Sequence, residues 1–209
     1  MSGTHKAPSI APAADRRVRR TRSLLHEALF GLIGEKDYDR ISVSEVLERA
    51  NIGRSTFYMH FRDKDELFES AIQEKLESLR AAGPAAANPV EPIMSFSRAV
   101  FEHVHSNLAA GGARMGRRGR AILHEHLRGV LARWIRDELA RSLQGRIRSS
   151  RGIPTELLAQ HVAATFVLVL EWWVDESGSP PAEAEALFRS LVLPSLSAAR
   201  QAATGSGRG

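Results

Sequence analysis

Residues 42–61 read SVSEVLERANIGRSTFYMHF, and this stretch decides how the chain folds. Ser42 and Glu45 have the spacing of a capping box, the pattern that opens an α-helix. The following apolar residues recur at intervals of three and four, so they share one helical face: Val43, Val46, Leu47 and Ala50. Asn51, a residue type that tolerates positive φ, ends this helix. Gly53 can cap a second helix, which is predicted over 54–60.

Two short helices joined by a tight turn are the layout of a helix-turn-helix, whose second helix enters the major groove of DNA N-terminus first. The exposed residues at that N-terminus would be Arg54, Ser55 and Thr56. Their side chains are hydrogen-bonding groups of the kind that contact base edges or phosphates. An ordinary helical hairpin has the same spacing, so the pattern by itself leaves both interpretations open.

The residues that follow resemble the TetR/AcrR family of bacterial transcriptional regulators, whose pattern is roughly Gly-Thr-Phe/Leu-Tyr-x-His-Phe-x-x-Lys-x-x-Leu. The matching string here is TFYMHF at 56–61, followed by Lys64 and Leu67, and the resemblance covers about residues 16–72. The chain departs from the family at three positions, where the family usually has Gly, Ser and Gly: Asn51, Gly53 and Ser55. The resemblance implies an all-α fold, with an N-terminal helix-turn-helix three-helix unit and a C-terminal helical ligand-binding and dimerisation domain.

Composition agrees with an all-α protein that works in the cytoplasm. The 209 residues are 43% hydrophobic and only 6% aromatic, and none is cysteine, which excludes disulfides, thiolate metal sites and a cysteine nucleophile. No signal peptide is recognisable. The longest apolar run, 162–170, is too short to cross a bilayer, so no membrane partner is expected. No phosphate loop or nucleophile elbow is present, and neither an enzymatic activity nor a cofactor is expected.

Positive charge gathers outside the predicted DNA-binding unit. Residues 15–64 contain 11 basic and 8 acidic residues, whereas residues 114–151 contain 11 arginines and 3 acidic residues. Three explanations of the second segment stay open: a solvated face, a rim that attracts an anionic effector, and further non-specific DNA contact. Arg117, Arg118 and Arg120 are expected in a Gly-rich loop.

We expect disordered tails at 1–14 and 199–209, a helix-turn-helix domain at 15–62, a connecting helix at 63–80 and a ligand-binding and dimerisation domain at 81–198. Within the last domain, helices are expected at 93–107, 121–148, 154–175 and 180–193. The third of these is apolar nearly all round and needs cover on every side. Pro194 is expected to end the last helix.

Five arginines lie within 16–22, at the start of the first helix, where the helix dipole disfavours cations. DNA phosphates would offset that cost, and the resemblance implies a further phosphate contact from Lys64. The expected DNA-binding residues are therefore Arg17, Arg20, Ser42, Arg54, Ser55, Thr56, Tyr58, His60 and Lys64.

A ligand pocket is expected among the 93–107, 121–148 and 154–175 helices, although the same residues would serve equally as core: Met94, Phe101, His105, Leu123, His126, Trp134, Phe166 and Trp173. The pairs His103/His105 and His124/His126 cannot chelate a metal alone, because helical residues two apart diverge by about 200°. No metal site is expected. The resemblance implies a homodimer, with an interface of Leu158, Val162, Phe166, Val167, Leu170, Leu187 and Leu191.

The sequence thus predicts a homodimeric repressor that occupies a double-stranded DNA operator and leaves it when an unknown small-molecule effector binds. An activator or a regulator that senses a protein partner fits the same fold. An all-α carrier or enzyme that does not bind DNA is the alternative from another class.

Overall fold

The computed structural model describes residues 13–81, 91–94, 96–109, 117–142 and 153–205, and within these ranges the chain is helical and has no β-strand. The elements are α1 (Ala13–Glu35), η1 (Tyr38–Arg40), α2 (Val43–Ala50), α3 (Arg54–Tyr58), α4 (Lys64–Ala81), α5 (Glu91–Met94), α6 (Phe96–Ala109), α7 (Arg117–Ser142), α8 (Thr155–Trp172), the π-helical turn η2 (Trp173–Ser177) and α9 (Pro181–Gly205). The predicted all-α fold is confirmed.

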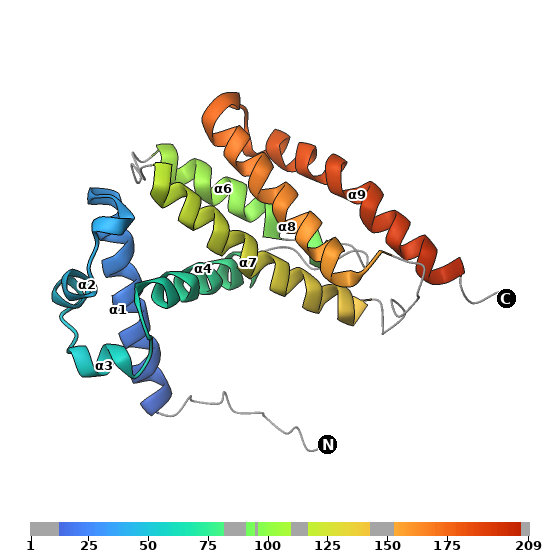
Figure 1. Cartoon of the computed structure of the whole chain (residues 1–209). Helices are drawn as coiled ribbons and strands as arrows, with labels where there is room; N and C mark the ends of the chain where they lie inside the picture. The colour runs from blue at the N-terminus through green and yellow to red at the C-terminus, as the bar shows by residue number, and fades with distance from the viewer. Residues whose placement is uncertain (1–12, 82–90, 95, 110–116, 143–152, 206–209) are drawn as a thin grey trace, which may run out of the picture.

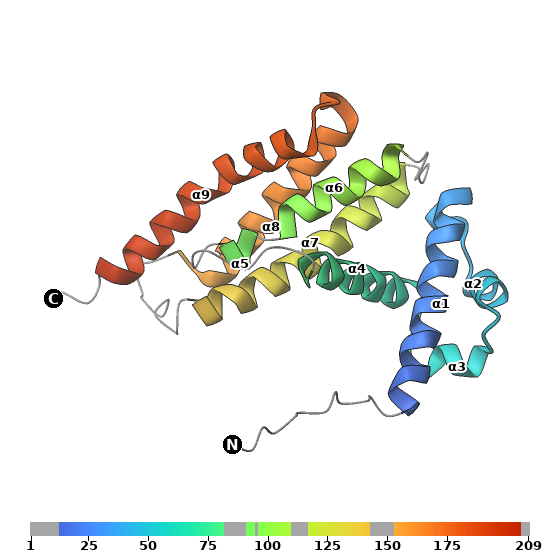
Figure 2. The same cartoon turned by 180° about the vertical axis from the view of Figure 1, so that it is seen from behind.

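The helices form two groups joined by α4 (Figures 1 and 2). Helices α1, α2 and α3 gather at one end of the molecule, and α1 packs against both α2 and α4. At the other end, α7 packs along α8, and α9 packs against α6 and α8. Helix α4 belongs to neither group alone, because it also packs against α6 and α7.

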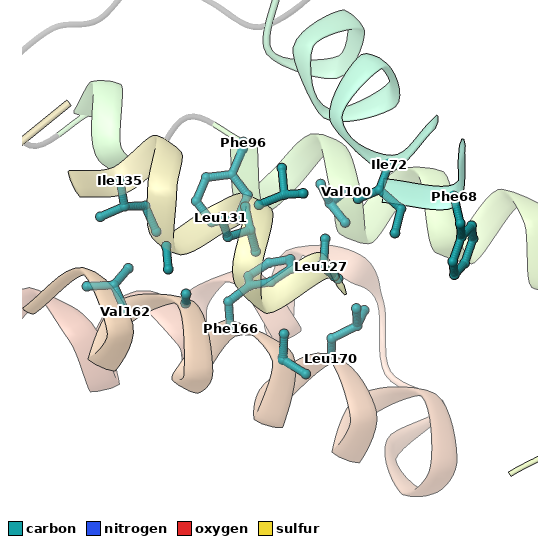
Figure 3. Close-up of a cluster of buried hydrophobic side chains, with 14 of the residues drawn as sticks. Phe68, Ile72, Phe96, Val100, Leu127, Leu131, Ile135, Val162, Phe166 and Leu170 are labelled. Atoms are coloured by element: carbon teal, nitrogen blue, oxygen red, sulfur yellow. The ribbon is translucent and has the colours of Figure 1, made fainter. Parts of the chain in front are cut away.

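The core of the larger group is built around α7 and α8 (Figure 3). Leu131 and Ile135 of α7 are buried between Phe96 of α6 and Val162 and Phe166 of α8. The Phe166 ring lies 4.8 Å from that of Phe96, 5.1 Å from that of Phe101 and 5.2 Å from that of Phe188. Each fully buried phenylalanine stabilises the fold by about 1.5–3 kcal/mol, so this aromatic cluster fixes how α6, α8 and α9 meet.

Helix α8 is the apolar helix expected at 154–175. With the turn that follows, Thr155–Glu176 is long and apolar enough to cross a membrane by length and composition. A core helix of a soluble protein passes the same test, and α8 is covered by α7 and α9. Gly178 then takes positive φ (55°), and the Trp173 Nε1 donates a 2.8 Å hydrogen bond to the Ser179 carbonyl oxygen. This turn reverses the chain into α9.

The expected end of the last helix and the expected inner limits of both tails are wrong. Helix α9 does not end at Pro194 but continues to Gly205, so part of the expected tail at 199–209 is helical. Buried Leu196 and Ala199 lie beyond the proline, and this packing offsets the proline's cost of about 3 kcal/mol. Likewise, α1 begins at Ala13, inside the tail expected at 1–14, whose first twelve residues lie outside the described part.

The expected Gly-rich loop is the third region that differs. Arg117, Arg118 and Arg120 belong to the first turn of α7, and residues 110–116 lie outside the described part. The Arg120 guanidinium donates a 2.5 Å hydrogen bond to the Asp175 carboxylate. Arg120 thus lies in a helix and forms an ion pair with the turn after α8, and the loop expected at this residue is wrong.

Three histidines are held in surroundings that disfavour their charged form. His26 on α1 is 7% exposed, with its Nδ1 3.1 Å from the Glu74 carboxylate on α4. Burial lowers the pKa of His26 despite Glu74, and neighbouring Arg22 lowers it further. Burial likewise lowers the pKa of His103 and of His124.

We therefore expect the free energy of unfolding to fall as the pH is lowered from 7.5 to 5.5. A folded-state pKa below the unfolded value of about 6.5 means that the unfolded chain binds more protons in this range, so acid favours unfolding. Urea denaturation at pH 7.5, 6.5 and 5.5 measures the trend. His26→Gln should flatten it, whereas the same change at exposed His105 on α6 should not. A trend unaffected by the His26 change would contradict this assignment.

Candidate nucleic-acid interface

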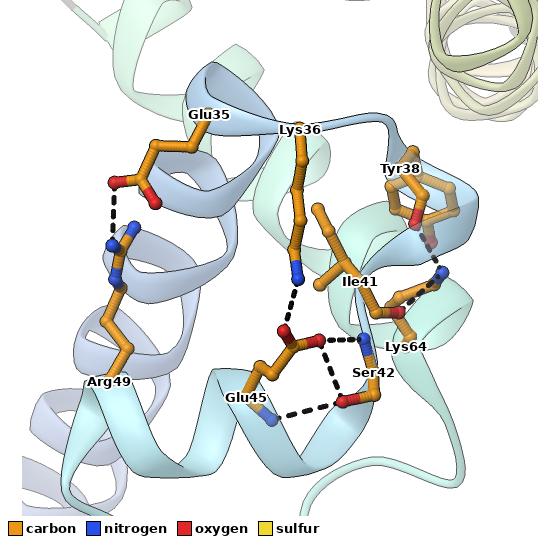
Figure 4. A network of polar contacts seen from close by, with 8 residues as sticks. All are labelled: Glu35, Lys36, Tyr38, Ile41, Ser42, Glu45, Arg49 and Lys64. Carbon is orange, nitrogen blue, oxygen red and sulfur yellow. Dashed lines mark hydrogen bonds and ion pairs between the residues drawn. The ribbon is translucent and has the colours of Figure 1, made fainter.

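The capping box expected at the start of α2 is present (Figure 4). The Glu45 N–H donates to the Ser42 Oγ at 3.3 Å, and the Ser42 N–H donates to the Glu45 carboxylate at 2.9 Å. The Lys36 ammonium also donates to Glu45, and these bonds hold the pKa of Glu45 at about 2. A second bridge, from Arg49 to Glu35 at 2.6 Å, ties the other end of α2 to α1. The polar side of α2 is therefore fixed at both ends.

The turn between α2 and α3 has the geometry that its residues predict. Asn51 takes the left-handed conformation, with φ 53° and ψ 46°. The Ile52 N–H then donates to the Leu47 carbonyl oxygen at 3.0 Å and closes the helix end. Phe57 is fully buried in the angle between the helices, where Val46 is also buried. The helix-turn-helix is thus held by a closed turn and an aromatic wedge, although α3 ends at Tyr58 rather than at His60.

The N-terminus of α3 presents an open polar surface. Arg54 and Ser55 are exposed and Thr56 is half-buried. The Arg54 guanidinium donates a 2.8 Å hydrogen bond to the Ser44 Oγ, which joins this surface to the first turn of α2. Ser44 was missed in the sequence, although it lies outside the apolar stripe of α2 and is exposed. The bond orients Arg54 before any DNA is present.

The far end of α3 continues this surface. Tyr58 is 52% exposed and Met59 is 72% exposed, whereas His60 is half-buried with its ring 6.3 Å from that of Phe61. Met59 was not expected as a site residue, and only its exposure points to it. Ser42 is exposed, but its hydroxyl is engaged in the cap of α2.

Lys64 has a structural position at the start of α4 (Figure 4). Its ammonium donates to the carbonyl oxygens of Tyr38 at 2.7 Å and Ile41 at 3.0 Å, and it lies 3.9 Å from the centre of the Tyr38 ring. Burial lowers the pKa of Lys64. Two of its three N–H donors are therefore engaged inside the protein, and one is left for the phosphate contact that remains a prediction.

The cap of α4 differs in one respect from a capping box. The Glu66 N–H donates to the Asp63 carboxylate at 2.8 Å, as in a capping box. The Glu66 carboxylate, however, accepts from the Arg62 N–H at 2.7 Å instead of from Asp63. The start of α4 is thus joined to the residue directly after the aromatic string.

The arginines of α1 divide into two sets. Arg17 and Arg20 are exposed, and no bond joins either to another described residue. Arg22 instead donates a 2.6 Å hydrogen bond to Ser70 of α4 and lies 5.6 Å from the centre of the Phe61 ring. The structure thus leaves Arg17 and Arg20 available for DNA and uses Arg22 to join α1 to α4.

A cavity of about 280 Å³ opens between α4, α6 and α7. Of the eight residues expected to bind a ligand, only Trp134 lines it. Four of the others are buried in the close-packed core, which was the alternative position expected for these residues: Met94, Phe101, Phe166 and Trp173. The remaining three lie elsewhere: His126 against Phe68 of α4, exposed His105 near the Trp173 ring, and half-buried Leu123.

The expected interface residues also divide by burial. Leu158, Val162, Phe166, Val167 and Leu170 are buried within the subunit, where they have little surface left for a partner. The exposed apolar residues of α8 and α9 are instead Leu157, Leu168, Trp172, Leu187 and Leu191. The first three were missed, although their spacing puts them on one stripe of α8.

We expect Ser42→Ala to lower the free energy of unfolding by about 1 kcal/mol, because it removes the side-chain cap of α2. Chemical denaturation measures this loss. Ser78→Ala is the control, since Ser78 is exposed inside α4 and caps nothing, and it should have a much smaller effect. Equal losses in the two variants would show that the cap is not what stabilises α2.

Comparison with known proteins agrees with this geometry. The family model described as "Bacterial regulatory proteins, tetR family" matches residues 25–71, from the middle of α1 into α4. YxbF of Bacillus subtilis, an uncharacterized HTH-type transcriptional regulator, is 38% identical over 78 residues, which are 37% of this chain and only 20% of YxbF. The HTH-type transcriptional regulator TcmR of Streptomyces glaucescens is 26% identical over 183 residues, covering 82% of this chain and 81% of TcmR.

The solved structure of RolR in complex with resorcinol has the same fold. It aligns with a TM-score of 0.55 and 20% identity, over 93% of this chain and 97% of RolR. The relatives are transcriptional regulators and not enzymes, which confirms that no enzymatic activity is to be expected. The capped helix-turn-helix and the sequence matches together show that residues 25–71 of the chain are the N-terminal domain of the TetR family of bacterial regulatory proteins.

Proposed function

We propose that this protein is a dimeric repressor, which occupies operator DNA through α2 and α3 in the cytoplasm and leaves it when a small molecule binds between α4 and α7. In this proposal α1–α3 form the DNA-binding unit, α4 is the connecting helix, and α5–α9 form the effector-binding and dimerisation unit. The observation that carries the proposal is that α4 contacts both the helix-turn-helix unit and the cavity.

The contacts along α4 follow one another in order. Lys64 binds the carbonyl oxygens of η1, and the Phe68 ring lies 5.1 Å from that of Tyr38. On its other side Phe68 lies 5.6 Å from the His126 ring of α7. Farther along α4, Leu76 and Glu77 line the cavity. A ligand that shifts this part of α4 would therefore shift η1 and α1 as well, because packed helices move as rigid pieces.

The proposed DNA contacts follow from exposure. Arg54 and Ser55 lie where the second helix of a helix-turn-helix contacts base edges. Tyr58, Arg17 and Arg20 are exposed near this helix and suit phosphate contacts, which position a protein without reading sequence. Lys64 would add a phosphate contact beside its structural role.

RolR offers a precedent for a small ligand in this fold, since its structure holds resorcinol. The cavity described here has about 280 Å³, close to the lower end of the roughly 300–1,000 Å³ usual for small-molecule sites. A molecule with one or two rings is therefore a suitable size.

A second copy of the chain is the proposed cover for the exposed apolar residues of α8 and α9. Helical spacing puts exposed Leu157, Leu168 and Trp172 on one stripe of α8 with His161, and exposed Leu187 and Leu191 on one stripe of α9 with Ser195. The His161 Nε2 lies 3.2 Å from the Ser195 Oγ, so the two stripes adjoin. Burying this apolar surface in a dimer would also place two copies of α3 on one DNA molecule.

We expect Arg54→Ala to change which DNA sequences are preferred, by about 1–3 kcal/mol for each affected base pair. Tyr58→Phe should instead weaken binding to all sequences alike, because it removes a hydroxyl that contacts phosphate. Selection from a random DNA library, followed by footprinting of the DNA flanking the protein's own gene, measures both effects. Uniform weakening by the Arg54 change, with the preference intact, would show that these roles are reversed.

We expect Leu191→Glu to convert the dimer into a monomer, because an unpaired charge in an apolar interface costs several kcal/mol. Sedimentation at micromolar concentration gives the oligomeric state. Leu108→Glu is the matched control: Leu108 on α6 is exposed to the same extent as Leu191, 48%, and lies off the α8/α9 face. A monomeric wild-type protein at this concentration would contradict the proposed dimer.

A further inference from the structure

The lining of the cavity between α4, α6 and α7 contains the chemistry that decides which ligand it accepts. Its apolar part consists of Leu76, Phe96, Val130, Leu131 and Trp134. Its polar part consists of Gln73 and Glu77 from α4 and Arg133, Arg136 and Asp137 from α7. Two positive and two negative side chains thus surround the apolar part, and the sign of the favoured ligand depends on which of them are already neutralised.

Both arginines have carboxylate partners inside the protein. The Arg133 guanidinium donates to the Glu69 carboxylate of α4. The Arg136 guanidinium lies 3.4 Å from the Asp137 carboxylate and 3.5 Å from the Glu156 carboxylate of α8. An anionic ligand would have to displace these carboxylates or share the guanidinium groups with them. The positive charges of Arg133 and Arg136 are therefore matched before a ligand arrives, and the negative charge of Asp137 is matched by Arg136.

Glu77 differs from the other charged residues of the lining. Within the described part of the chain its carboxylate accepts one hydrogen bond, at 3.0 Å from the neutral amide of Gln73, and it has no ion pair. Gln73 orients the carboxylate without neutralising it. The charge that remains unmatched at the cavity is thus negative.

The aromatic rings of the lining favour the same kind of ligand. Trp134 and Phe96 meet edge to face, with 5.3 Å between the ring centres. The negative face of an aromatic ring, tryptophan's most of all, attracts organic cations. A carboxylate and an indole in one small cavity therefore both act on a positive group, while the leucines and Val130 accept an apolar body.

We propose that this cavity binds a small organic cation, an amine or quaternary ammonium compound with an aromatic or aliphatic body, and that Glu77 and Trp134 select it. The site itself follows from the lining residues. Only the statement that this cation is the effector rests on the proposed function.

Calorimetric titration of the full-length protein with three one-ring compounds tests the charge preference. Benzyltrimethylammonium is the cation, benzyl alcohol is neutral and benzoate is the anion. We expect the cation to bind about five- to tenfold more tightly than the alcohol, as one carboxylate and one cation–π contact would give, and benzoate to bind most weakly. Tightest binding of benzoate would overturn the proposal, because the arginines would then set the ligand class. Absence of binding by all three compounds would overturn it too.

Variants locate the preference. Glu77→Gln should remove most of the advantage of the cation over the alcohol, and Trp134→Leu should weaken binding of both. Glu125→Gln is the matched control, because Glu125 is exposed on α7 and does not line the cavity. Equal effects of the Glu77 and Glu125 changes would overturn the role of Glu77.

A separate titration of the operator complex with the cation tests the proposed function. Binding of the cation through Glu77 without release of DNA would support the ligand site and contradict effector-controlled repression. Release by the cation in the wild type, with a higher concentration needed for Glu77→Gln, would support both.

Discussion

The ammonium group of Lys64 holds the start of α4 to the short helix η1, and the arrangement of the two helix groups depends on this attachment. The Tyr38 carbonyl oxygen accepts from the Ile41 N–H at 3.1 Å, which closes η1, and Lys64 donates both to this oxygen and to the carbonyl oxygen of Ile41. The Tyr38 hydroxyl in turn donates to Asp65 at 2.5 Å. Because Ile41 directly precedes the cap of α2, the same attachment also sets where the helix-turn-helix begins relative to α4.

Cross-helix ion pairs give the arginines of α7 a role that their number alone does not reveal. Arg133 pairs with Glu69 of α4, Arg120 with Asp175 after α8, and Arg136 with Glu156 of α8. Each is partly exposed and contributes at most about 1 kcal/mol. Together they fix the position of α7, because they join it to α4 on one side and to α8 and the turn after α8 on the other. Much of the basic excess at 114–151 within the described part is thus matched by acids from other segments.

The packing of α8 explains how one helix can serve the core and a partner. Phe166 and Val162 face the ring cluster and α7, so they are buried within the subunit, whereas Leu168 and Trp172 face outward. A helix that is apolar all round can meet both demands because its opposite faces are separate surfaces. The proposed dimer uses the second surface and leaves the first unchanged.

The sequence by itself determined the local structure of the DNA-binding unit. The spacing of Ser42 and Glu45, the left-handed Asn51 and the buried Phe57 depend on residues close together in the chain, so capping and periodicity rules predict them well. Helix ends elsewhere depended on distant contacts: α9 passes Pro194 because its next turns are buried, and α7 starts at Arg117. Capping and periodicity rules describe one helix at a time, so they do not include packing between helices.

Only the tertiary structure decided which apolar residues form core, cavity or exposed face. Periodicity marks Phe101, Trp134 and Leu168 alike as apolar positions on helices. In the structure, Phe101 is in the core, Trp134 lines the cavity and Leu168 is exposed. The same holds for charge. The sequence shows Arg133 and Glu77, but not that the Glu69 carboxylate matches Arg133, nor that Glu77 accepts from the neutral amide of Gln73 and has no ion pair within the described residues. These differences depend on how α4, α6, α7 and α8 cross, because burial and charge pairing belong to pairs of elements and not to single helices.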